Sequence, residues 1–426
     1  MHIELINTGT ELMLGRVLNT HQQWICRQFA DLGYEVTRQV CIADAAGEIQ
    51  NAVREALARA DLVITTGGLG PTSDDITREL IAECFGKRLQ TDTAVLAEIE
   101  KFFAARKKPV PERSKVQALV PEGATVLPNR NGLAPGLAMK LAPNKFRSDG
   151  KPAWLIMLPG PPRELRPMFT EFVAPLVQKE FPIETPFVCR TLRTSGIGES
   201  MVADRISEPL KNLVEAGLEV GYCARVGQVD VRVSARNLRA GELVRAAEKN
   251  LREKLGGHIF GCEDDELEAV IVRELTARKR TLATAESCTG GAIANRITNV
   301  PGASEIFLGG FVTYSNESKQ KFLGVCAETL AQHGAVSKAV AREMAEGARK
   351  QTGADFALSV SGIAGPSGGT ESKPVGTVFI GLAGGFPTIV VQNFNPYDRL
   401  TFKDVAVTQA LELLRRKLVK ISWETT

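Results

Sequence analysis

The sequence predicts an α/β protein with two domains built on parallel-type sheets and joined by a small α+β module. Short apolar runs alternate with helix-like segments towards both ends of the chain, which is typical of parallel sheets covered on both faces. A length of 426 residues is too great for one ordinary hydrophobic core. The pattern changes around residues 182–186 and again at the acidic residues 263–266. We therefore expect domains at residues 1–180 and 265–426, with the small α+β module at residues 185–261.

The composition indicates a globular protein with no strong charge preference. Hydrophobic residues make up 44% of the chain, and 52 Lys and Arg against 49 Asp and Glu give 52 − 49 = +3. This balance does not favour a general nucleic-acid or membrane-surface role. No apolar run approaches the roughly 18 residues of a membrane-spanning helix, and no signal-peptide pattern begins the chain. The eight cysteines and four histidines are scattered, without a zinc signature. We expect a reduced, cytoplasmic protein.

The first domain alternates strands and helices. We expect strands at residues 3–8, 35–42, 61–66 and 155–158, and helices at residues 21–32 and 46–59. A glycine-rich turn follows the third strand. Asp74 and Asp75 are then expected in the first turn of a helix that continues over residues 76–85, where carboxylates suit the positive helix terminus. The polar segment 140–151 is predicted to be a hairpin or surface loop.

The rest of the chain shows a change of pattern and then a return to alternation. In the middle module we expect strands at residues 190–193 and 229–235 and helices at residues 199–211 and 241–255. In the last domain we expect strands at residues 281–285, 305–313, 356–360 and 376–383. Four helices are expected in this domain. The first ends at residue 278, the second begins at residue 290, and the other two span residues 337–352 and 397–417.

A serine stands where a strand of the last domain turns into a helix. Ser287 follows a short apolar strand and precedes Gly290 and Gly291 in the run AESCTGG. At a helix N-terminus, backbone N–H groups and the helix dipole can stabilise a developing oxyanion. A nucleophilic serine also needs a proton acceptor, and no histidine lies nearby in the sequence. Ser287 is therefore a candidate nucleophile whose base must be another residue type.

The best local candidate for that base is Lys319, which follows the apolar run at residues 306–312. A lysine has an ordinary pKa of about 10.4, so it acts as a base near neutrality only when it is desolvated or lies beside positive charge. The apolar run can provide that desolvation. Taken alone, however, a helix-capping serine and a solvated lysine are the commoner roles of such residues.

Further motifs favour the catalytic interpretation. Residues 359–369 form a strand running into a glycine-rich loop, the usual ligand position at the edge of an open α/β sheet. The segment ends in SGIAGPSGG and is followed by KPVGTV. Together with AESCTGG, FVTYSNESK and AQHGAVS, these motifs closely resemble the CinA C-terminal family, the bacterial nicotinamide-nucleotide amidohydrolases. The resemblance covers nearly all of residues 265–426.

This resemblance implies hydrolysis of nicotinamide mononucleotide to nicotinate mononucleotide and ammonia, with no cofactor at this site. It implies that Ser287 is the nucleophile, that Lys319 is its base and that Tyr314 lies near the dyad. The substrate-binding residues expected in this domain are Thr289, Gly290, Ser361, Gly362 and Arg399.

Three of these positions have alternative interpretations. Thr289 is more often a helix-capping hydroxyl in such a position, and Arg399 is equally well an exposed residue at a helix start. Cys288 is an alternative nucleophile. It has no nearby histidine or second cysteine, which favours a packed thiol instead.

The first domain carries a second set of motifs. The segments TGTEL, TGGLGPT followed by DDIT, NGLAPG and LPGPPRE resemble the molybdopterin-binding fold of molybdenum-cofactor proteins. In this arrangement the whole chain resembles a full-length CinA protein. That resemblance implies a second activity, the cleavage of ADP-ribose to AMP and ribose 5-phosphate with a divalent metal ion of unspecified identity.

Glycine N–H groups can approach a phosphate closely, and carboxylates can hold a cation that bridges a pyrophosphate. The expected substrate-binding residues are Gly67, Gly68, Gly70, Thr72 and Gly160. The expected metal ligands are Asp74, Asp75 and Glu11. Helix capping is the alternative role for the two aspartates.

The middle module resembles the small KH-like module of the same family. Its GIGES run superficially resembles the G-x-x-G loop of RNA-binding KH domains. The loop lacks a basic pair, and Glu199 would repel phosphate. We interpret the module as a spacer and interface, with RNA binding as the minor alternative.

Three functional hypotheses follow from these motifs. The leading one is a bifunctional nucleotide hydrolase of pyridine-nucleotide recycling, which acts on nicotinamide mononucleotide and ADP-ribose. The alternatives are a molybdopterin-handling protein with a non-catalytic C-terminal half and a DNA-competence-associated protein. The near-neutral charge argues against direct binding of nucleic acid. We expect no membrane partner, and we expect a homodimer.

Overall fold

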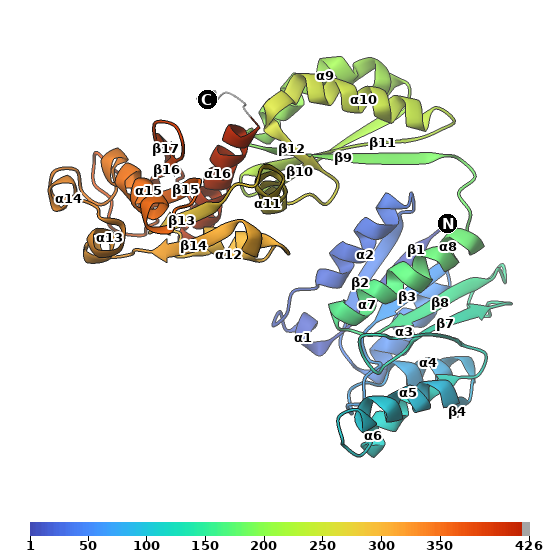
Figure 1. Ribbon diagram of the computed structural model, residues 1–426. Helices are drawn as coiled ribbons and strands as arrows, with labels where there is room; N and C mark the ends of the chain where they lie inside the picture. The colour runs from blue at the N-terminus through green and yellow to red at the C-terminus, as the bar shows by residue number, and fades with distance from the viewer. Residues whose placement is uncertain (420–426) are drawn as a thin grey trace. The chain divides into compact units, whose positions relative to one another are not determined.

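The structure is a computed structural model that describes residues 1–419. Its contacts divide the chain into two compact units, Met1–Phe187 and Val188–Thr426. Both units consist of sheets with helices packed on them, so the predicted α/β class is confirmed (Figure 1). Within residues 1–419, no helix combines the length and the apolar character needed to cross a membrane.

The first unit is built on a six-stranded sheet in the order β2-β1-β3-β8-β7-β6. The four predicted strands are its parallel members: β2 (Val36–Ile42), β1 (Ile3–Thr8), β3 (Leu62–Thr66) and β8 (Ala153–Leu158). Two further strands, β7 (Gly136–Leu141) and β6 (Thr125–Leu127), pair antiparallel beyond β8 and were not predicted. Because β1, β3 and β8 are parallel neighbours, their carboxyl ends lie at one edge of the sheet.

Helices cover both faces of this sheet. One core lies under α2 (Thr20–Asp31), α7 (Pro162–Met168), the π-helix η2 (Phe169–Val173) and α8 (Ala174–Glu180). The other core lies under α3 (Ala46–Leu57) and α4 (Thr77–Phe85). In the first core the ring of Phe169 packs edge-on against Trp24 and Phe29. The short helix α1 (Thr10–Met13) directly follows β1.

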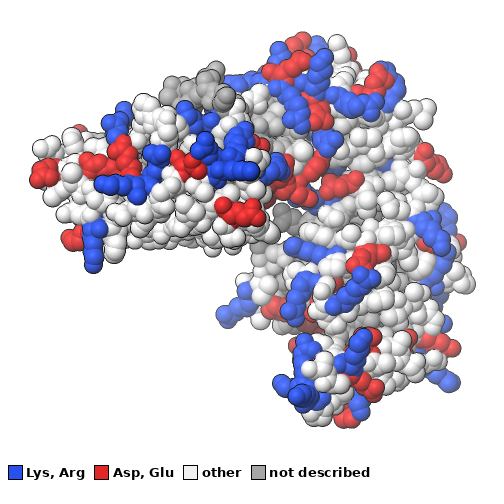
Figure 2. Space-filling model, in the orientation of Figure 1, with Lys and Arg blue, Asp and Glu red and all other residues white. Residues whose placement is uncertain are grey.

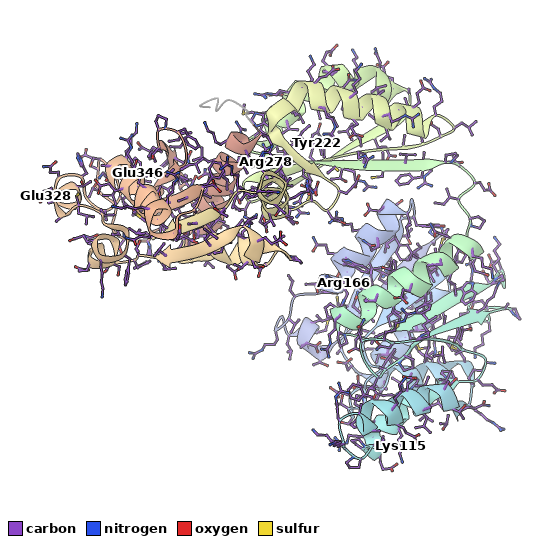
Figure 3. All side chains as sticks on the ribbon, viewed as in Figure 1. Lys115, Arg166, Tyr222, Arg278, Glu328 and Glu346 are labelled. Atoms are coloured by element: carbon purple, nitrogen blue, oxygen red, sulfur yellow. The ribbon has the colours of Figure 1, made fainter. Side chains whose placement is uncertain are left out.

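A group of short elements follows α4 and lies beside it (Figure 1). Its members are β4 (Leu89–Thr91), α5 (Thr93–Ala104), α6 (Glu112–Lys115), η1 (Val116–Ala118) and β5 (Leu119–Pro121). Strands β4 and β5 pair antiparallel. Asp92 caps α5, because its carboxylate accepts from the backbone N–H groups of Ala94 and Val95 at 3.0 Å each. Figure 3 labels Lys115, on α6.

The helix after the glycine-rich turn begins later than predicted. α4 starts at Thr77, with Ile76 at its N-cap and no capping side chain. Asp74 and Asp75 therefore lie before the helix, and both the predicted first-turn position and the capping role are wrong for them. Asp75 is drawn back into the turn, where its Oδ2 accepts from the backbone N and the hydroxyl of Thr72 at 2.9 and 2.5 Å.

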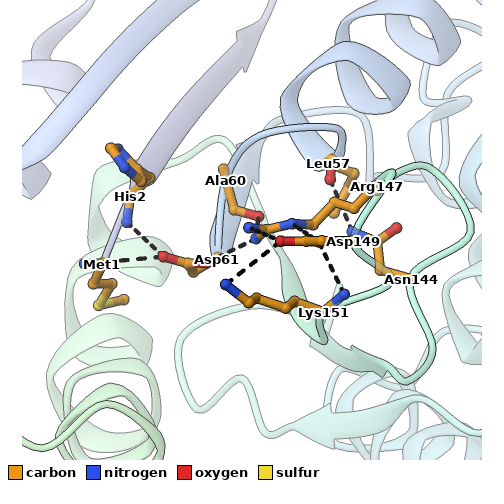
Figure 4. A network of polar contacts seen from close by, with 9 residues as sticks. All are labelled: Met1, His2, Leu57, Ala60, Asp61, Asn144, Arg147, Asp149 and Lys151. Carbon is orange, nitrogen blue, oxygen red and sulfur yellow. Dashed lines mark hydrogen bonds and ion pairs between the residues drawn. The ribbon is translucent and has the colours of Figure 1, made fainter.

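The connection between β7 and β8 is pinned by polar contacts (Figure 4). Residues 140 and 141 of the predicted loop belong to β7, and the loop itself follows. The Arg147 guanidinium donates to Asp61 at 2.7 Å, and the Asn144 amide donates to the Leu57 carbonyl at 2.8 Å. Burial alone would raise the pKa of Asp61, but hydrogen bonds from Arg147 and the His2 backbone lower it. The loop is thereby held to the end of α3 and the start of β3.

The second unit begins with a four-stranded sheet in the order β10-β11-β9-β12. Its strands are β9 (Phe187–Ser195), β10 (Leu218–Arg225), β11 (Gln228–Arg236) and β12 (Ile259–Cys262), and its helices are α9 (Glu199–Glu215) and α10 (Ala240–Leu255). The two helices and the sheet enclose a core of their own. β10 was not predicted. Most of its residues are exposed, so it lacks the alternating apolar pattern of a half-buried strand.

A five-stranded sheet follows in the order β14-β13-β15-β16-β17. Its strands are β13 (Leu282–Glu286), β14 (Phe307–Val312), β15 (Phe356–Gly362), β16 (Thr377–Ala383) and β17 (Ile389–Phe394). One core contains residues of α11 (Leu267–Arg278), α12 (Ala292–Thr298) and α16 (Arg399–Leu418). The other contains residues of α13 (Asn316–Leu323), α14 (Ala327–His333) and α15 (Lys338–Thr352). β14 and β15 both run parallel to β13, so these three strands end at one edge.

Polar contacts join the two sheets of the second unit. From the C-terminal half of α16, the Arg415 guanidinium donates to the Gly257 carbonyl at 2.5 Å, and Arg416 contacts His258 Nδ1 at 3.0 Å. From β9, Arg193 donates to Asp230 and to the Asp265 carbonyl. The module that we interpreted as a spacer and interface lies in the same compact unit as the last domain.

Candidate functional site

The predicted nucleophile lies at the edge where three strands of the last sheet end. Ser287 directly follows β13, and its backbone N–H donates to the Val360 carbonyl of β15 at 3.0 Å. Thr313 follows β14 and donates its N–H to the Glu286 carbonyl at 2.9 Å. The parallel order of β14, β13 and β15 therefore brings together segments that are far apart in sequence.

Lys319 projects from α13 onto this edge. Its Nζ lies 3.0 Å from Ser287 Oγ, and it donates to the carbonyl oxygens of Thr313 and Tyr314 at 2.8 and 3.2 Å. A neutral amine has two N–H donors and one lone pair. With both N–H groups bound to carbonyls, the lone pair is left for the Ser287 hydroxyl proton.

The surroundings of the dyad favour a neutral lysine and an inert cysteine. Lys319 is 1% exposed, and desolvation lowers the pKa of its ammonium group. Burial raises the pKa of the neighbouring Cys288 thiol to about 12. A thiol with that pKa forms almost no thiolate near neutrality. The structure thus places a buried amine beside Ser287 and leaves Cys288 as a packed core side chain.

A buried carboxylate that the sequence analysis missed shapes the serine turn. Glu286 is 1% exposed and accepts hydrogen bonds from the Thr289 hydroxyl at 2.7 Å and from the N–H groups of Gly291, Ile293 and Ala294 at 3.0, 3.1 and 2.9 Å. Because Glu286 binds these three N–H groups, they are not free for the oxyanion that we expected at this helix terminus. A Glu that ends a buried strand just before a glycine turn and a helix was the available signal.

Two cations at the start of α16 face the same turn. Arg399 is exposed at the helix start, yet its guanidinium donates to the Tyr314 hydroxyl and to the Gly365 carbonyl at 2.9 Å each. Lys403, one turn later, was not predicted. Its Nζ lies 3.8 Å from the position that a Cβ atom would take on Gly290, whose φ is +65°. Among residues 1–419, no carboxylate forms an ion pair with Lys403.

The remaining predicted residues of this site are occupied by structural contacts. The Ser361 hydroxyl donates to the Ala335 carbonyl at 2.7 Å and is 1% exposed. A Cβ atom on Gly362 would lie 3.0 Å from the Phe402 ring and 2.9 Å from the Thr377 carbonyl, so this glycine permits close packing of β15 on α16 and β16.

A separate cleft of about 760 Å³ lies in the first unit. It opens at the edge where β1, β3 and β8 end, and residues from all three strand ends line it. Of the predicted residues, the following line it: Glu11, Gly67, Gly68, Gly70, Asp74, Asp75 and Gly160. Thr72 does not line it and instead binds Asp75. The structure thus brings the strand-end motifs of the first domain to one place.

The glycines of this cleft allow close approach of its turns. A Cβ on Gly67, whose φ is +98°, would lie 2.8 Å from the Thr8 carbonyl oxygen. On Gly68, whose φ is +70°, it would collide with the Thr77 hydroxyl at 1.9 Å. These positions require glycine because both the backbone conformation and the space exclude a side chain.

Carboxylates line the cleft without forming a metal cage. Asp44 accepts from the Thr10 backbone at 2.8 Å and Glu164 accepts from the Asn129 amide at 2.7 Å, and both line the cleft with the predicted metal residues. In the described part of the chain, no three Asp, Glu, His or Cys side chains are grouped to hold an ion. Mg²⁺ is often held by one or two carboxylates with substrate phosphates and waters. Glu11 and Asp74 line the cleft, but no cage of protein ligands surrounds them within the described residues.

Comparisons with known proteins match three segments of the chain, namely the first domain, the middle module and the last domain. The model of a "Probable molybdopterin binding domain" matches residues 4–179, that of the "Damage-inducible protein CinA KH domain" matches residues 189–261, and that of the "CinA C-terminal domain" matches residues 264–418. A competence-damage inducible protein of Caldicellulosiruptor saccharolyticus is 44% identical over 98% of this chain and 100% of its own. The chain belongs to the CinA family. A CinA-like protein of Gemmatimonas aurantiaca is 41% identical over 99% of this CinA chain and 97% of its own.

Some solved structures are similar to part of this CinA-family chain. The competence/damage inducible protein CihA from Agrobacterium tumefaciens is 40% identical and covers 36% of this chain and 93% of its own, with a TM-score of 0.34. A CinA superfamily protein from Escherichia coli is 31% identical and covers 38% of this chain and 97% of its own, with a TM-score of 0.35.

Proposed function

We propose that the last domain of this CinA-family protein is a nicotinamide-nucleotide amidase that converts nicotinamide mononucleotide to nicotinate mononucleotide and ammonia. One observation carries the proposal: buried Lys319 lies 3.0 Å from Ser287 Oγ, with two carbonyls accepting its N–H groups. A serine hydroxyl beside a desolvated amine is the nucleophile and base pair that amide hydrolysis needs.

The residues supply each step of acyl transfer. Lys319 takes the Ser287 proton while Oγ bonds to the amide carbon, and then gives that proton to the departing nitrogen as the C–N bond breaks. Water attacks the resulting acyl-enzyme with Lys319 again as base, which releases the carboxylate and regenerates the serine. Within residues 1–419, the backbone N–H groups of Cys288 and Thr289 donate to no oxygen and contact only the Cys288 sulfur, a weak acceptor, so we assign the oxyanion to them.

The cations at the start of α16 suit the phosphate of the substrate. Lys403 has no carboxylate partner among the described residues and lies beside the Gly290 turn. Arg399 holds Tyr314 and the Gly365 carbonyl, so it can orient this wall of the site. We assign the phosphate to Lys403 and the positioning of Tyr314 to Arg399.

We propose a second activity for the first domain, the cleavage of ADP-ribose to AMP and ribose 5-phosphate. The supporting observation is the 760 Å³ cleft, lined by close-packed glycine turns at the carboxyl ends of three parallel strands. When bound beside Glu11 and Asp74, a divalent ion would supply positive charge for the pyrophosphate oxygens. The glycine turns would bind the phosphates through backbone N–H groups.

The two alternative functions have less support. The match to a probable molybdopterin binding domain favours a molybdopterin ligand in the same cleft. That function, however, gives the Ser287–Lys319 contact no role. For direct DNA binding, a continuous basic surface would be needed. Figure 2 shows Lys and Arg interspersed with Asp and Glu over the displayed face.

The decisive experiment incubates the purified full-length protein separately with nicotinamide mononucleotide and with ADP-ribose, each with and without a divalent metal ion. Ammonia release from the first substrate and AMP release from the second are measured. The Ser287→Ala variant is the matched control for the amidase. Ammonia release that persists in this variant contradicts the amidase assignment, and absence of AMP with every metal contradicts the pyrophosphatase assignment.

A further inference from the structure

The buried carboxylate of Glu286 occupies the backbone donors at the start of α12. Its Oε2 accepts from the N–H groups of Gly291 and Ile293 at 3.0 and 3.1 Å, and its Oε1 accepts from that of Ala294 at 2.9 Å. These backbone groups can only donate, and each has a carboxylate oxygen as its partner. The side chain, which is 1% exposed, thereby ties the end of β13 to the first turn of α12.

The same carboxylate spans the serine turn, which comprises residues 287–291. The Thr289 hydroxyl donates to Glu286 Oε2 at 2.7 Å, so the carboxylate contacts the turn on both sides of Gly290. Gly290 and Gly291 both have left-handed backbones, with φ of +65° and +93°. Two consecutive glycines have a wide choice of backbone conformations, so their own sequence does not select this one. The contacts to Glu286 supply that selection.

The groups assigned to the reaction lie inside this short turn. Ser287 carries the nucleophile, and the oxyanion is assigned to the N–H groups of Cys288 and Thr289. Thr289 therefore offers its N–H to the oxyanion while its hydroxyl is held by Glu286. We infer that Glu286 is a positioning residue of the amidase, which holds the turn so that these two N–H groups face the oxyanion. This role rests on the proposed amidase function.

A positioning role of this kind acts on the chemical step and spares substrate binding. Negative charge on the carbonyl oxygen develops in the transition state, and donors aligned with it there raise kcat without tightening the bound substrate. Among the described residues, no hydrogen bond joins Lys319 to Glu286. The pH dependence set by the lysine should therefore not depend on Glu286.

The kinetics of Glu286→Gln in the full-length protein test this role. The variant keeps the length of the side chain but replaces one acceptor oxygen with a donor NH2 group, so at least one of the four hydrogen bonds is lost. We expect kcat for nicotinamide mononucleotide to fall roughly 10²-fold, the loss caused by a misplacement of about 1 Å. KM should stay within about twofold, and the rising limb of the pH profile should not move. A displaced limb would assign the loss to Lys319 and overturn the role.

A thioamide substrate reports on the oxyanion donors directly. In thionicotinamide mononucleotide, sulfur replaces the carbonyl oxygen and accepts N–H hydrogen bonds weakly. Aligned N–H groups therefore favour the amide over the thioamide, and this preference should weaken when the turn is released. We expect the amide-to-thioamide ratio of kcat to fall about tenfold in Glu286→Gln. A loss of folded protein alone would lower both rates equally and leave the ratio unchanged.

Glu343→Gln is the matched control. Glu343, on α15, also accepts from a backbone N–H and from a threonine hydroxyl, those of Cys326 and Thr329, at 2.8 and 2.6 Å. Its contacts lie at the start of α14 instead of in the serine turn. The control should keep kcat and the amide-to-thioamide ratio within about twofold of the parent protein. If Glu286→Gln is poorly folded, Thr289→Val removes only the hydroxyl bond and should lower the ratio in the same direction.

Hydrogen exchange of the Gly290 N–H, followed by NMR, gives a readout that needs no activity. This group donates to the Ser287 carbonyl at 3.1 Å and not to Glu286, so it reports on the turn itself. Exchange should be faster in Glu286→Gln than in the parent and the control. An unchanged thioamide ratio or unchanged Gly290 exchange in folded Glu286→Gln overturns the role and leaves the amidase standing. Absence of ammonia release in the parent refutes the amidase, and Gly290 exchange then still decides whether Glu286 holds the turn.

Discussion

Lys319 Nζ lies 3.0 Å from Ser287 Oγ, although the two residues are 32 positions apart in the chain. Two backbone carbonyls hold the amine, and burial removes it from water. The amine is therefore oriented before any substrate arrives, which reduces the reorganisation needed during reaction.

Replacing either member of this pair should abolish deamidation. Ser287→Ala removes the nucleophile, and Lys319→Met removes the base while keeping a buried side chain of similar length. Each should lower kcat/KM for nicotinamide mononucleotide by at least about 10³-fold, and the double variant should be no worse than either single one. Ammonia release and thermal unfolding are measured together. Substantial activity in a folded Lys319→Met protein would contradict the base assignment.

The pH dependence of the amidase should report the buried lysine. Desolvation lowers the pKa of Lys319 from its ordinary value of 10.5, and the neutral form is the active one. Activity should therefore rise as the pH passes upward through the lowered pKa and reach its plateau below the ordinary lysine range. The profile of kcat/KM against pH provides the measurement. A limb centred at or above 10.5 would show that the base is a solvated lysine.

Cys288 should be dispensable for the chemistry. Burial raises the pKa of its thiol to about 12, so iodoacetamide at neutral pH should leave the enzyme active. Cys288→Ala should keep activity within about twofold and reduce stability by about 1 kcal/mol through lost packing. Loss of ammonia release in a Cys288→Ala protein that is still folded at the assay temperature would instead assign the cysteine a catalytic part.

Removing the ammonium group of Lys403 should weaken substrate binding and not the chemical step. Lys403→Met should raise KM for nicotinamide mononucleotide roughly tenfold, the effect of one charge-assisted hydrogen bond, with kcat little changed. Nicotinamide riboside, which has no phosphate, provides the control and should be processed equally by both proteins. An equal loss with both substrates would place Lys403 outside the phosphate site.

The two proposed activities should respond differently to metal removal. A chelator should stop ADP-ribose cleavage, because the carboxylates of the first unit suit an ion shared with pyrophosphate. Ammonia release should continue, since the Ser287 site needs only a base and backbone donors. Asp74→Asn should reproduce the chelator, and Ser287→Ala should affect deamidation alone. Loss of both activities in a protein that stays folded would contradict two independent sites.

Strong local patterns were predictable from sequence, and contacts between distant segments were not. The parallel strands β1, β3 and β8 are largely buried apolar runs, whereas the edge strand β2 is partly exposed, and all four were predicted. β10 was missed because most of its side chains are exposed, and β6 because it is only three residues long. The start of α4 was misplaced because Asp75 binds back to Thr72 instead of capping the helix.

The same distinction holds for the candidate site. Ser287, Lys319 and the glycine turns lie in recognisable local motifs, so the sequence pointed to them. Lys403 lies on a helix with no motif of its own, and only the folded chain places it beside the Gly290 turn. Glu286 was overlooked because its four hydrogen bonds exist only once α12 has formed.

Helix α16 has partners at both of its ends, and this restricts how its length can change. Its first turns carry Arg399 and Lys403, and its last turns carry Arg415 and Arg416, which contact Gly257 and His258. One inserted residue would rotate everything after it by about 100° and advance it by about 1.5 Å. No insertion or deletion inside the helix can keep both sets of partners in phase and at the right height. The number of residues between the two ends of α16 is thus fixed by their contacts. Residues of this helix can be substituted, but its length cannot change without loss of one set of contacts.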